Sequence, residues 1–155
     1  MSDESTELRV VVAPLARGNV LIPGGAVSEV VSHQPLAPLK KSPVWVLGEL
    51  EWNGWQVPVI SYTRLMNRQA RDTVTTRSRI LIVRTLSETA PVPYIGLLVQ
   101  GLPRLARITE DALGDIEAQE KIEGVFRMVS FDGDTAVVPD LDEVTSLIEA
   151  TAYAA

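Results

Sequence analysis

The clearest structural signal in this sequence is the stretch Gly48-Glu-Leu-Glu-Trp-Asn-Gly-Trp-Gln-Val-Pro-Val-Ile-Ser-Tyr62. Apolar residues alternate on both sides of Asn53-Gly54. Such a pair between two runs predicts a β-hairpin, because a type I′ turn needs positive φ at both central residues. Trp52 and Trp55 would then face each other as an aromatic cross-strand pair. Pro58 marks the returning strand as an edge strand or a bulge, because proline cannot donate a hydrogen bond to a ladder. None of these side chains suits catalysis, so the segment is interpreted as a scaffold for recognition.

The rest of the chain consists mainly of short apolar runs separated by turns. Besides the hairpin at 45–61, the expected strands cover residues 8–15, 19–23, 78–86, 94–99, 105–108, 125–131 and 135–138. Many short strands of this kind indicate an all-β barrel or sandwich. Because alternate side chains of a strand point to opposite faces, the residues expected in the cores are Val57, Val59, Ile80, Ile82, Leu97 and Val99.

Helical structure is expected only in short segments. Residues 26–31 and 62–67 could each form one or two turns, and residues 109–119 form a helix or a loop. The best helix covers residues 140–150, where Asp140 can cap the N-terminus. Its apolar face consists of Leu141, Val144, Leu147 and Ile148.

Length and composition narrow the class of protein. A chain of 155 residues makes one domain, or one domain built from two small lobes. A hydrophobic content of 46% argues against disorder. The net charge of −6 argues against nucleic acid or an anionic membrane as the main partner. The absence of cysteine excludes disulfides and thiolate metal sites.

The termini suggest a cytoplasmic protein with short tails. Residues 1–7 are acidic and polar, unlike a signal peptide, and are expected to be a disordered tail. The folded domain is expected at 8–150, followed by a flexible tail at 151–155. No run approaches the ~18 apolar residues of a membrane span, so we expect no direct membrane insertion.

The sequence carries no signature of an enzyme. The single histidine, His33, lies in a proline-flanked loop without a second ligand at a suitable spacing. The carboxylates between Asp111 and Glu123 are spaced as on a solvated face. We therefore expect no catalytic residue, no metal and no cofactor.

The hairpin and several other motifs resemble the CheW-like family, the coupling proteins of bacterial chemosensory arrays. The residues that carry this resemblance are Ala26–Val30, Pro43, Gly48, Gly54, Val57–Ile60, Tyr94–Leu102, Ile122–Gly124, Val137–Leu141 and Leu147. The resemblance covers about residues 8 to 150. It implies two small SH3-like β-barrel lobes packed together. It also implies a non-enzymatic adaptor that links chemoreceptors to a CheA-type histidine kinase.

Three positions depart from the family pattern. Asn53 stands where the family usually has the Arg of a Leu-Arg-Gly hairpin tip, while Ser61 and Gln100 each replace an Asp. The altered tip favours an accessory coupling protein, of the sort found in twitching-motility clusters. The sequence does not distinguish a flagellar chemosensory system from a type IV pilus system. The alternative is an independent small β-barrel module that binds a peptide or ligand and has lost the coupling role.

The resemblance also implies where partners bind. Val27 and Glu29 would lie on a short helix at a receptor-facing groove. Independently of the resemblance, we expect Trp45 to be buried and the pair Trp52 and Trp55 to lie near a contact surface, because an exposed aromatic side chain is a typical interface anchor. The expected protein-binding residues are Val27, Glu29, Glu49, Glu51, Trp52, Asn53, Gly54 and Trp55. The implied partners are the regulatory domain of a CheA-type kinase and the cytoplasmic tip of a methyl-accepting chemoreceptor. Such partners would recruit the protein to the inner-membrane array.

An arginine-rich stretch has two interpretations. Arg64, Arg68, Arg71, Arg77 and Arg79 lie close in sequence, with Asp72 as the only acid among them. We favour a flexible, solvated loop. The other interpretation is a basic patch that meets an acidic partner and steers association.

Overall fold

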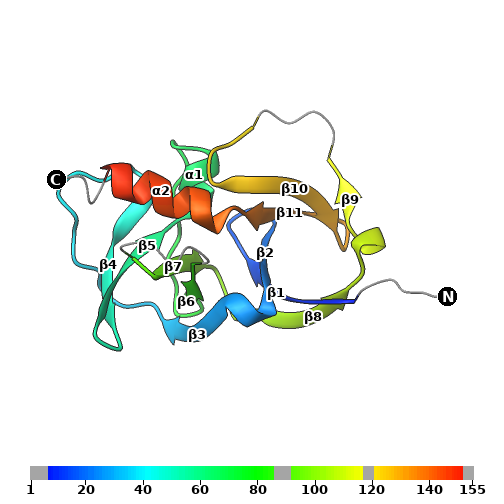
Figure 1. The fold of residues 1–155 in the computed structure, drawn as a ribbon, viewed down its shortest axis with the longest axis horizontal. Coiled ribbons are helices and arrows are strands. Elements are labelled where there is room, and N and C mark those ends of the chain that lie inside the picture. Colours follow the sequence, from blue (N-terminus) through cyan, green and yellow to red (C-terminus); the bar gives the residue numbers. More distant parts are fainter. Residues whose placement is uncertain (1–6, 86–91, 117–120, 152–155) are drawn as a thin grey trace.

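The computed structural model describes residues 7–85, 92–116 and 121–151. Within these residues the strands form two curled sheets that pack side by side (Figure 1). The all-β fold that the strand pattern predicts is confirmed, as are the two packed lobes that the family resemblance implies. Most of residues 1–7 and 151–155, expected as tails, lie outside the described residues.

We call the five-stranded sheet lobe 1. Its strand order is β3-β6-β7-β5-β4. The strand bounds are β3 (Val27–Ser32), β4 (Val46–Trp52), β5 (Trp55–Ile60), β6 (Arg79–Arg84) and β7 (Tyr94–Val99). Lobe 1 is therefore one continuous segment of the chain.

We call the six-stranded sheet lobe 2. Its order is β8-β1-β2-β11-β10-β9. The bounds are β1 (Leu8–Pro14), β2 (Asn19–Pro23), β8 (Arg104–Ile108), β9 (Gly114–Asp115), β10 (Val125–Phe131) and β11 (Asp134–Pro139). The helical segments are η1 (Gly24–Ala26), α1 (Tyr62–Met66), η2 (Glu110–Ala112) and α2 (Leu141–Thr151).

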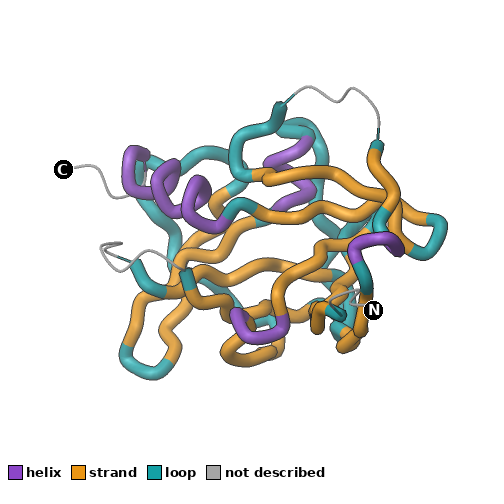
Figure 2. The backbone as a smooth tube through the Cα atoms, turned by 45° about the vertical axis from the view of Figure 1, so that its right-hand side comes forward, coloured by secondary structure: helices purple, strands orange, loops and turns teal. Residues whose placement is uncertain are grey.

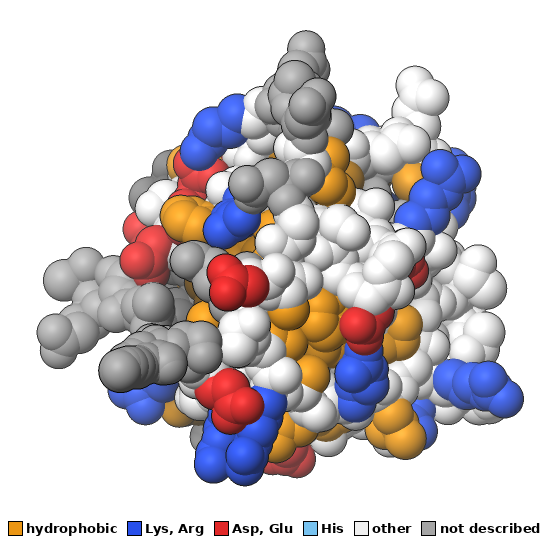
Figure 3. Space-filling model, turned by 90° about the vertical axis from the view of Figure 1, so that its right-hand side faces the viewer, with side chains coloured by type: hydrophobic (Ala, Val, Ile, Leu, Met, Phe, Trp, Pro, Cys, Tyr) orange, Lys and Arg blue, Asp and Glu red, His pale blue; other side chains and the backbone are white. Residues whose placement is uncertain are grey.

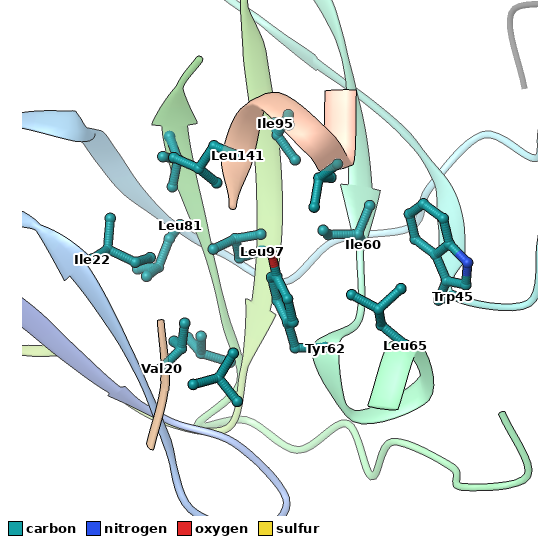
Figure 4. Packing of buried hydrophobic residues seen from close by; sticks show 14 of the residues in the cluster. Val20, Ile22, Trp45, Ile60, Tyr62, Leu65, Leu81, Ile95, Leu97 and Leu141 are labelled. Atoms are coloured by element: carbon teal, nitrogen blue, oxygen red, sulfur yellow. The ribbon is translucent and has the colours of Figure 1, made fainter. Parts of the chain in front are cut away.

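Side-chain alternation divides the apolar residues among three cores. On β6, Ile80 and Ile82 point into lobe 1, whereas Leu81 and Val83 point into a larger core between the lobes. Figure 4 shows this inter-lobe core, with Tyr62 from α1 in its middle. All six residues predicted for the cores are buried, as is Trp45.

A third core fills lobe 2. At the end of this lobe the Arg104 guanidinium lies 5.7 Å from the Phe131 ring centroid and pairs with Asp132 at 3.0 Å. Figure 3 views the molecule from this end, where apolar side chains form a central strip with charged ones around it.

The central hairpin forms as the sequence predicts. Trp52 lies directly opposite Trp55 in the β4–β5 register. Asn53 and Gly54 both have positive φ, at 47° and 82°, as a type I′ turn requires. The same chemistry forms the β10–β11 turn at Asp132-Gly133, with φ of 53° and 76°. In Figure 2 the β4–β5 hairpin projects at the lower left, away from lobe 2.

The expectation that Pro58 marks an edge strand is wrong. Strand β5 lies between β4 and β7. The parallel pairing with β7 uses only Val59 and Ile60, so Pro58 stands outside it and its missing N–H costs no bond there. The register irregularity falls on the partner strand, between Val46 and Gly48.

The expectation of a short helix around Val27 and Glu29 is also wrong. Helical structure there is limited to the 3₁₀ turn η1, and residues 27–32 form β3, which pairs antiparallel with β6. Three valines in this segment favour a pleated strand over a helix, because β-branched side chains lose rotamer freedom in a helix.

The two α-helices lie where the sequence predicts them, and α2 has the predicted cap. Ser61 Oγ accepts a hydrogen bond from the Arg64 amide, and Asp140 Oδ1 accepts one from the Glu143 amide. Helix α2 buries Leu141, Val144 and Ile148 against the inter-lobe core, as its apolar face predicts. Glu143 does not complete a capping box. Its carboxylate instead accepts a hydrogen bond from the Gly124 amide.

Candidate protein-interaction site

Two of the segments expected to bind partners meet at the hairpin tip. Strands β3 and β4 are the opposite edges of the lobe 1 sheet. Even so, the Trp52 indole Nε1 donates a 2.9 Å hydrogen bond to Glu29 Oε1. The sheet therefore curls far enough to bring its two edges together, as in a barrel.

A tyrosine joins the two tryptophans at this end of lobe 1. The Tyr94 ring centroid lies 4.9 Å from Trp52 at an interplanar angle of 65°, and 5.7 Å from Trp55 at 59°. These are favourable edge-to-face and tilted geometries. Trp52 is half-buried, while Trp55 is 44% exposed. We call Glu29, Trp52, Trp55 and Tyr94 the aromatic surface.

Tyr94 is not among the site residues that the sequence predicts. The available signal was weak, because an aromatic residue at the start of a predicted strand fits a core position as well as a surface one. Its place beside the tryptophans depends on the β5–β7 pairing, which joins segments distant in the chain.

The remaining expected site residues lie around the aromatic surface rather than in it. Strand alternation puts Glu49 and Glu51 on the face of the hairpin opposite Trp52. Asn53 and Gly54 form the exposed turn. Val27 is half-buried and packs against the inter-lobe core.

The arrangement of these groups suits binding. Aromatic rings with one polar edge, fixed by neighbours, are typical anchors of protein interfaces. The described residues contain no group of three or more His, Asp or Glu placed to hold a metal ion. The candidate site is therefore a recognition surface of aromatic area beside one carboxylate.

The arginine-rich stretch has fixed contacts at its two ends and at Asp72. Asp72 is largely buried and forms a 3.0 Å ion pair with Arg64, while its other oxygen accepts a 2.8 Å hydrogen bond from Ser61 Oγ. Arg79 donates hydrogen bonds to the backbone oxygens of Thr76 and Ser78. Asp72 therefore anchors this part of the stretch, whereas Arg68, Arg71 and Arg77 are exposed, as a solvated loop predicts.

Comparison with known proteins identifies one family. A family model described as the CheW-like domain matches residues 9–149. The chain belongs to the CheW-like family. A solved structure, the scaffolding protein TtCheW from Thermoanaerobacter tengcongensis, matches with a TM-score of 0.70 and 21% sequence identity. The match covers 88% of this chain and 90% of that chain. No curated protein matches the sequence.

Two departures from the CheW-like pattern now have local explanations. Asn53 occupies a left-handed turn position, which Asn tolerates better than most residues. Ser61 is buried and both caps α1 and holds Asp72, so a carboxylate still lies beside this position. Across the described ranges, no helix has the length and apolar character to cross a membrane.

Proposed function

We propose that this CheW-like protein is a non-enzymatic adaptor that couples chemoreceptors to a CheA-type histidine kinase. Family membership supports this function, and the TtCheW neighbour is described as a scaffolding protein. The partners would be the kinase regulatory domain and the cytoplasmic tip of a methyl-accepting chemoreceptor. The protein would then act in the cytoplasm, at the inner-membrane array, in chemotaxis or twitching motility.

The observation that carries the proposal is the exposure of Trp55 on a hairpin that is held in place. Its side chain is 44% exposed although it stands on a hairpin fixed by the Trp52–Glu29 hydrogen bond and the Tyr94 ring. An aromatic side chain held in this way loses little conformational freedom on binding. It can therefore act as an anchor, with Glu29 and the turn residues at its rim.

The test is isothermal titration calorimetry with a CheA-type regulatory domain and a receptor-tip fragment from the same genome. Trp55→Ala should weaken binding to one of these partners by at least about 1–2 kcal/mol, the usual loss for an aromatic anchor. The matched control is Phe126→Ala, since Phe126 is 67% exposed and lies in the other sheet. The control should bind like the parent.

Circular dichroism of each variant ensures that binding is compared between folded proteins. A folded Trp55→Ala variant that binds both partners as well as the parent would remove the hairpin from the interface. Failure of the parent itself to bind either partner would instead favour the alternative, an independent β-barrel module for a peptide or ligand.

A further inference from the structure

A cleft at the junction of the lobes lies apart from the aromatic surface. It has a volume of about 430 Å³. One wall is the β1–β2 turn of lobe 2, with Ala16 and Arg17. The other is the segment from α1 to Arg71, with Thr63, Met66, Asn67 and Ala70. In Figure 1, α1 stands at this junction.

Both walls of the cleft are held by contacts behind them. In the β1–β2 turn, Gly18 has φ of +72°, and a Cβ there would lie 2.3 Å from the Thr135 carbonyl oxygen. Only glycine permits this approach, so the turn sits directly on β11. On the other wall, the ion pair of Asp72 with Arg64 fixes the residue that follows Arg71. Arg17 and Arg71 therefore project from a backbone that is anchored on both sides.

The two arginines lack partners within the described residues, as Arg9 and Arg107 do, but they differ from those in lining one cleft. Arg64 and Arg104 form ion pairs, and Arg79 binds backbone oxygens. Arg17 and Arg71 are exposed and form no hydrogen bond or ion pair with the described part of the chain. Two free guanidinium groups beside one cleft are a local excess of positive charge on a protein of net charge −6.

We propose that this cleft binds an acidic peptide segment of a partner protein. A guanidinium group matches a carboxylate through two parallel hydrogen bonds, so each arginine would take one Asp or Glu side chain. Ala16, Met66 and Ala70 supply apolar surface for a small side chain between the two acids. The Thr63 hydroxyl and the Asn67 amide supply polar groups for the peptide backbone.

The exposure of both arginines explains why a peptide fits better than a free anion. An exposed ion pair is screened by water and salt and changes affinity by only a few-fold. A small anion gains little more than that. A peptide combines two such pairs with apolar contacts to Met66. The volume also lies within the usual range for a site that encloses several groups.

The probe is a short blocked peptide of alternating Glu and Ala, titrated into the ¹⁵N-labelled full chain and followed by NMR. The control peptide has Gln in place of Glu. Backbone amides of Arg17, Asn67 and Arg71 should shift with the Glu peptide and not with the Gln peptide. The double variant Arg17→Gln/Arg71→Gln should weaken binding about three- to ten-fold, and added salt should weaken binding to the parent.

The matched control variant is Arg9→Gln/Arg107→Gln. It also removes two positive charges, but from exposed positions that face each other on β1 and β8, outside the cleft. It should bind the Glu peptide like the parent. Equal weakening by the two double variants would overturn the proposal, because only net charge would then matter. Inorganic phosphate that shifts the same amides with the same affinity would also overturn it, as would shifts confined to another surface.

The cleft shares no residue with the aromatic surface. Loss of peptide binding in the Arg17/Arg71 variant therefore tests this proposal alone. The calorimetric comparison of Trp55→Ala with Phe126→Ala tests the adaptor function separately.

Discussion

Glu29 and Trp52, 23 residues apart in the chain, are joined by a 2.9 Å hydrogen bond between the two edges of one sheet. The bond closes the end of lobe 1 on which Trp55 stands. A double-mutant cycle of Glu29→Ala and Trp52→Phe should show a coupling of about 0.5–1 kcal/mol, because the acceptor is charged but solvent-exposed. Urea unfolding of the four proteins measures it. Glu51→Ala combined with Trp52→Phe is the control and should be additive, since Glu51 faces the other side of β4.

The turn residue Asn53 limits which substitutions the hairpin tolerates. Its φ of 47° favours Asn or Gly. Asn53→Arg should therefore lower the free energy of unfolding by about 1 kcal/mol, whereas Asn53→Gly should change it little. A cationic fork at the tip can pair with a carboxylate, so the folded Arg variant should bind a conventional CheA-type regulatory domain at least as tightly as the parent. Weaker binding by that variant in calorimetry would contradict this prediction.

Gly96 leaves room for the core of lobe 1. A Cβ at this position would lie 2.9 Å from Ile80 Cγ2 and 3.0 Å from Val59 Cγ2. Both neighbours are β-branched and stiff, so Gly96→Ala should cost about 1–3 kcal/mol of stability through overpacking. The control is Gly25→Ala, where a Cβ meets nothing within 4 Å. Chemical denaturation should show little change for the control, and equal stability of the two variants would contradict the packing argument.

The buried Tyr62 hydroxyl makes the stability of the folded protein depend on pH above about pH 10. Its hydroxyl donates a 2.8 Å hydrogen bond to the Gly124 carbonyl. Burial raises the pKa of Tyr62 well above its usual value of 10.0, and the charges of Asp140 and Glu143 add to the effect. Above pH 10 the unfolded chain loses this proton while the folded protein keeps it, so stability falls as pH rises. Below pH 10 this contribution is fully present.

The comparison with Tyr62→Phe isolates that effect. At neutral pH the free energy of unfolding of the variant should be about 1 kcal/mol lower than that of the parent, because the hydrogen bond is missing. Above pH 10 the free energy of unfolding of the parent should fall with pH more steeply than that of the variant, by up to about 1.4 kcal/mol per pH unit. Unfolding measured across this range would contradict the prediction if the two proteins showed parallel pH profiles.

The sequence predicted those parts of the structure whose conformation is set by residues close together in the chain. The Asn53-Gly54 turn follows from backbone conformations that few other residues adopt. The α2 helix follows from its cap and its apolar spacing. The strand at residues 27–32 was missed because a segment of six residues is too short for its period to separate helix from strand.

Contacts between distant segments could not be predicted in this way. The parallel pairings of β2 with β11 and of β5 with β7 depend on how whole sheets close. For the same reason the sequence placed Glu29 and Trp52 on the surface without joining them. Asp72 was noticed as a lone acid among arginines, but its burial depends on Ser61 and Arg64 meeting it in the fold.

The order of strands along the chain has a consequence for biosynthesis. Lobe 1 is complete once residue 99 has emerged, whereas lobe 2 pairs β2, made early, with β11, which ends at Pro139. A ribosome releasing this chain would therefore present one complete five-stranded sheet, preceded by an N-terminal hairpin whose partner strands have not yet been made. Domains generally fold in order of synthesis, and contacts of long sequence separation form slowly. The inter-lobe core and the Arg17–Arg71 cleft should accordingly be the last parts of the molecule to assemble.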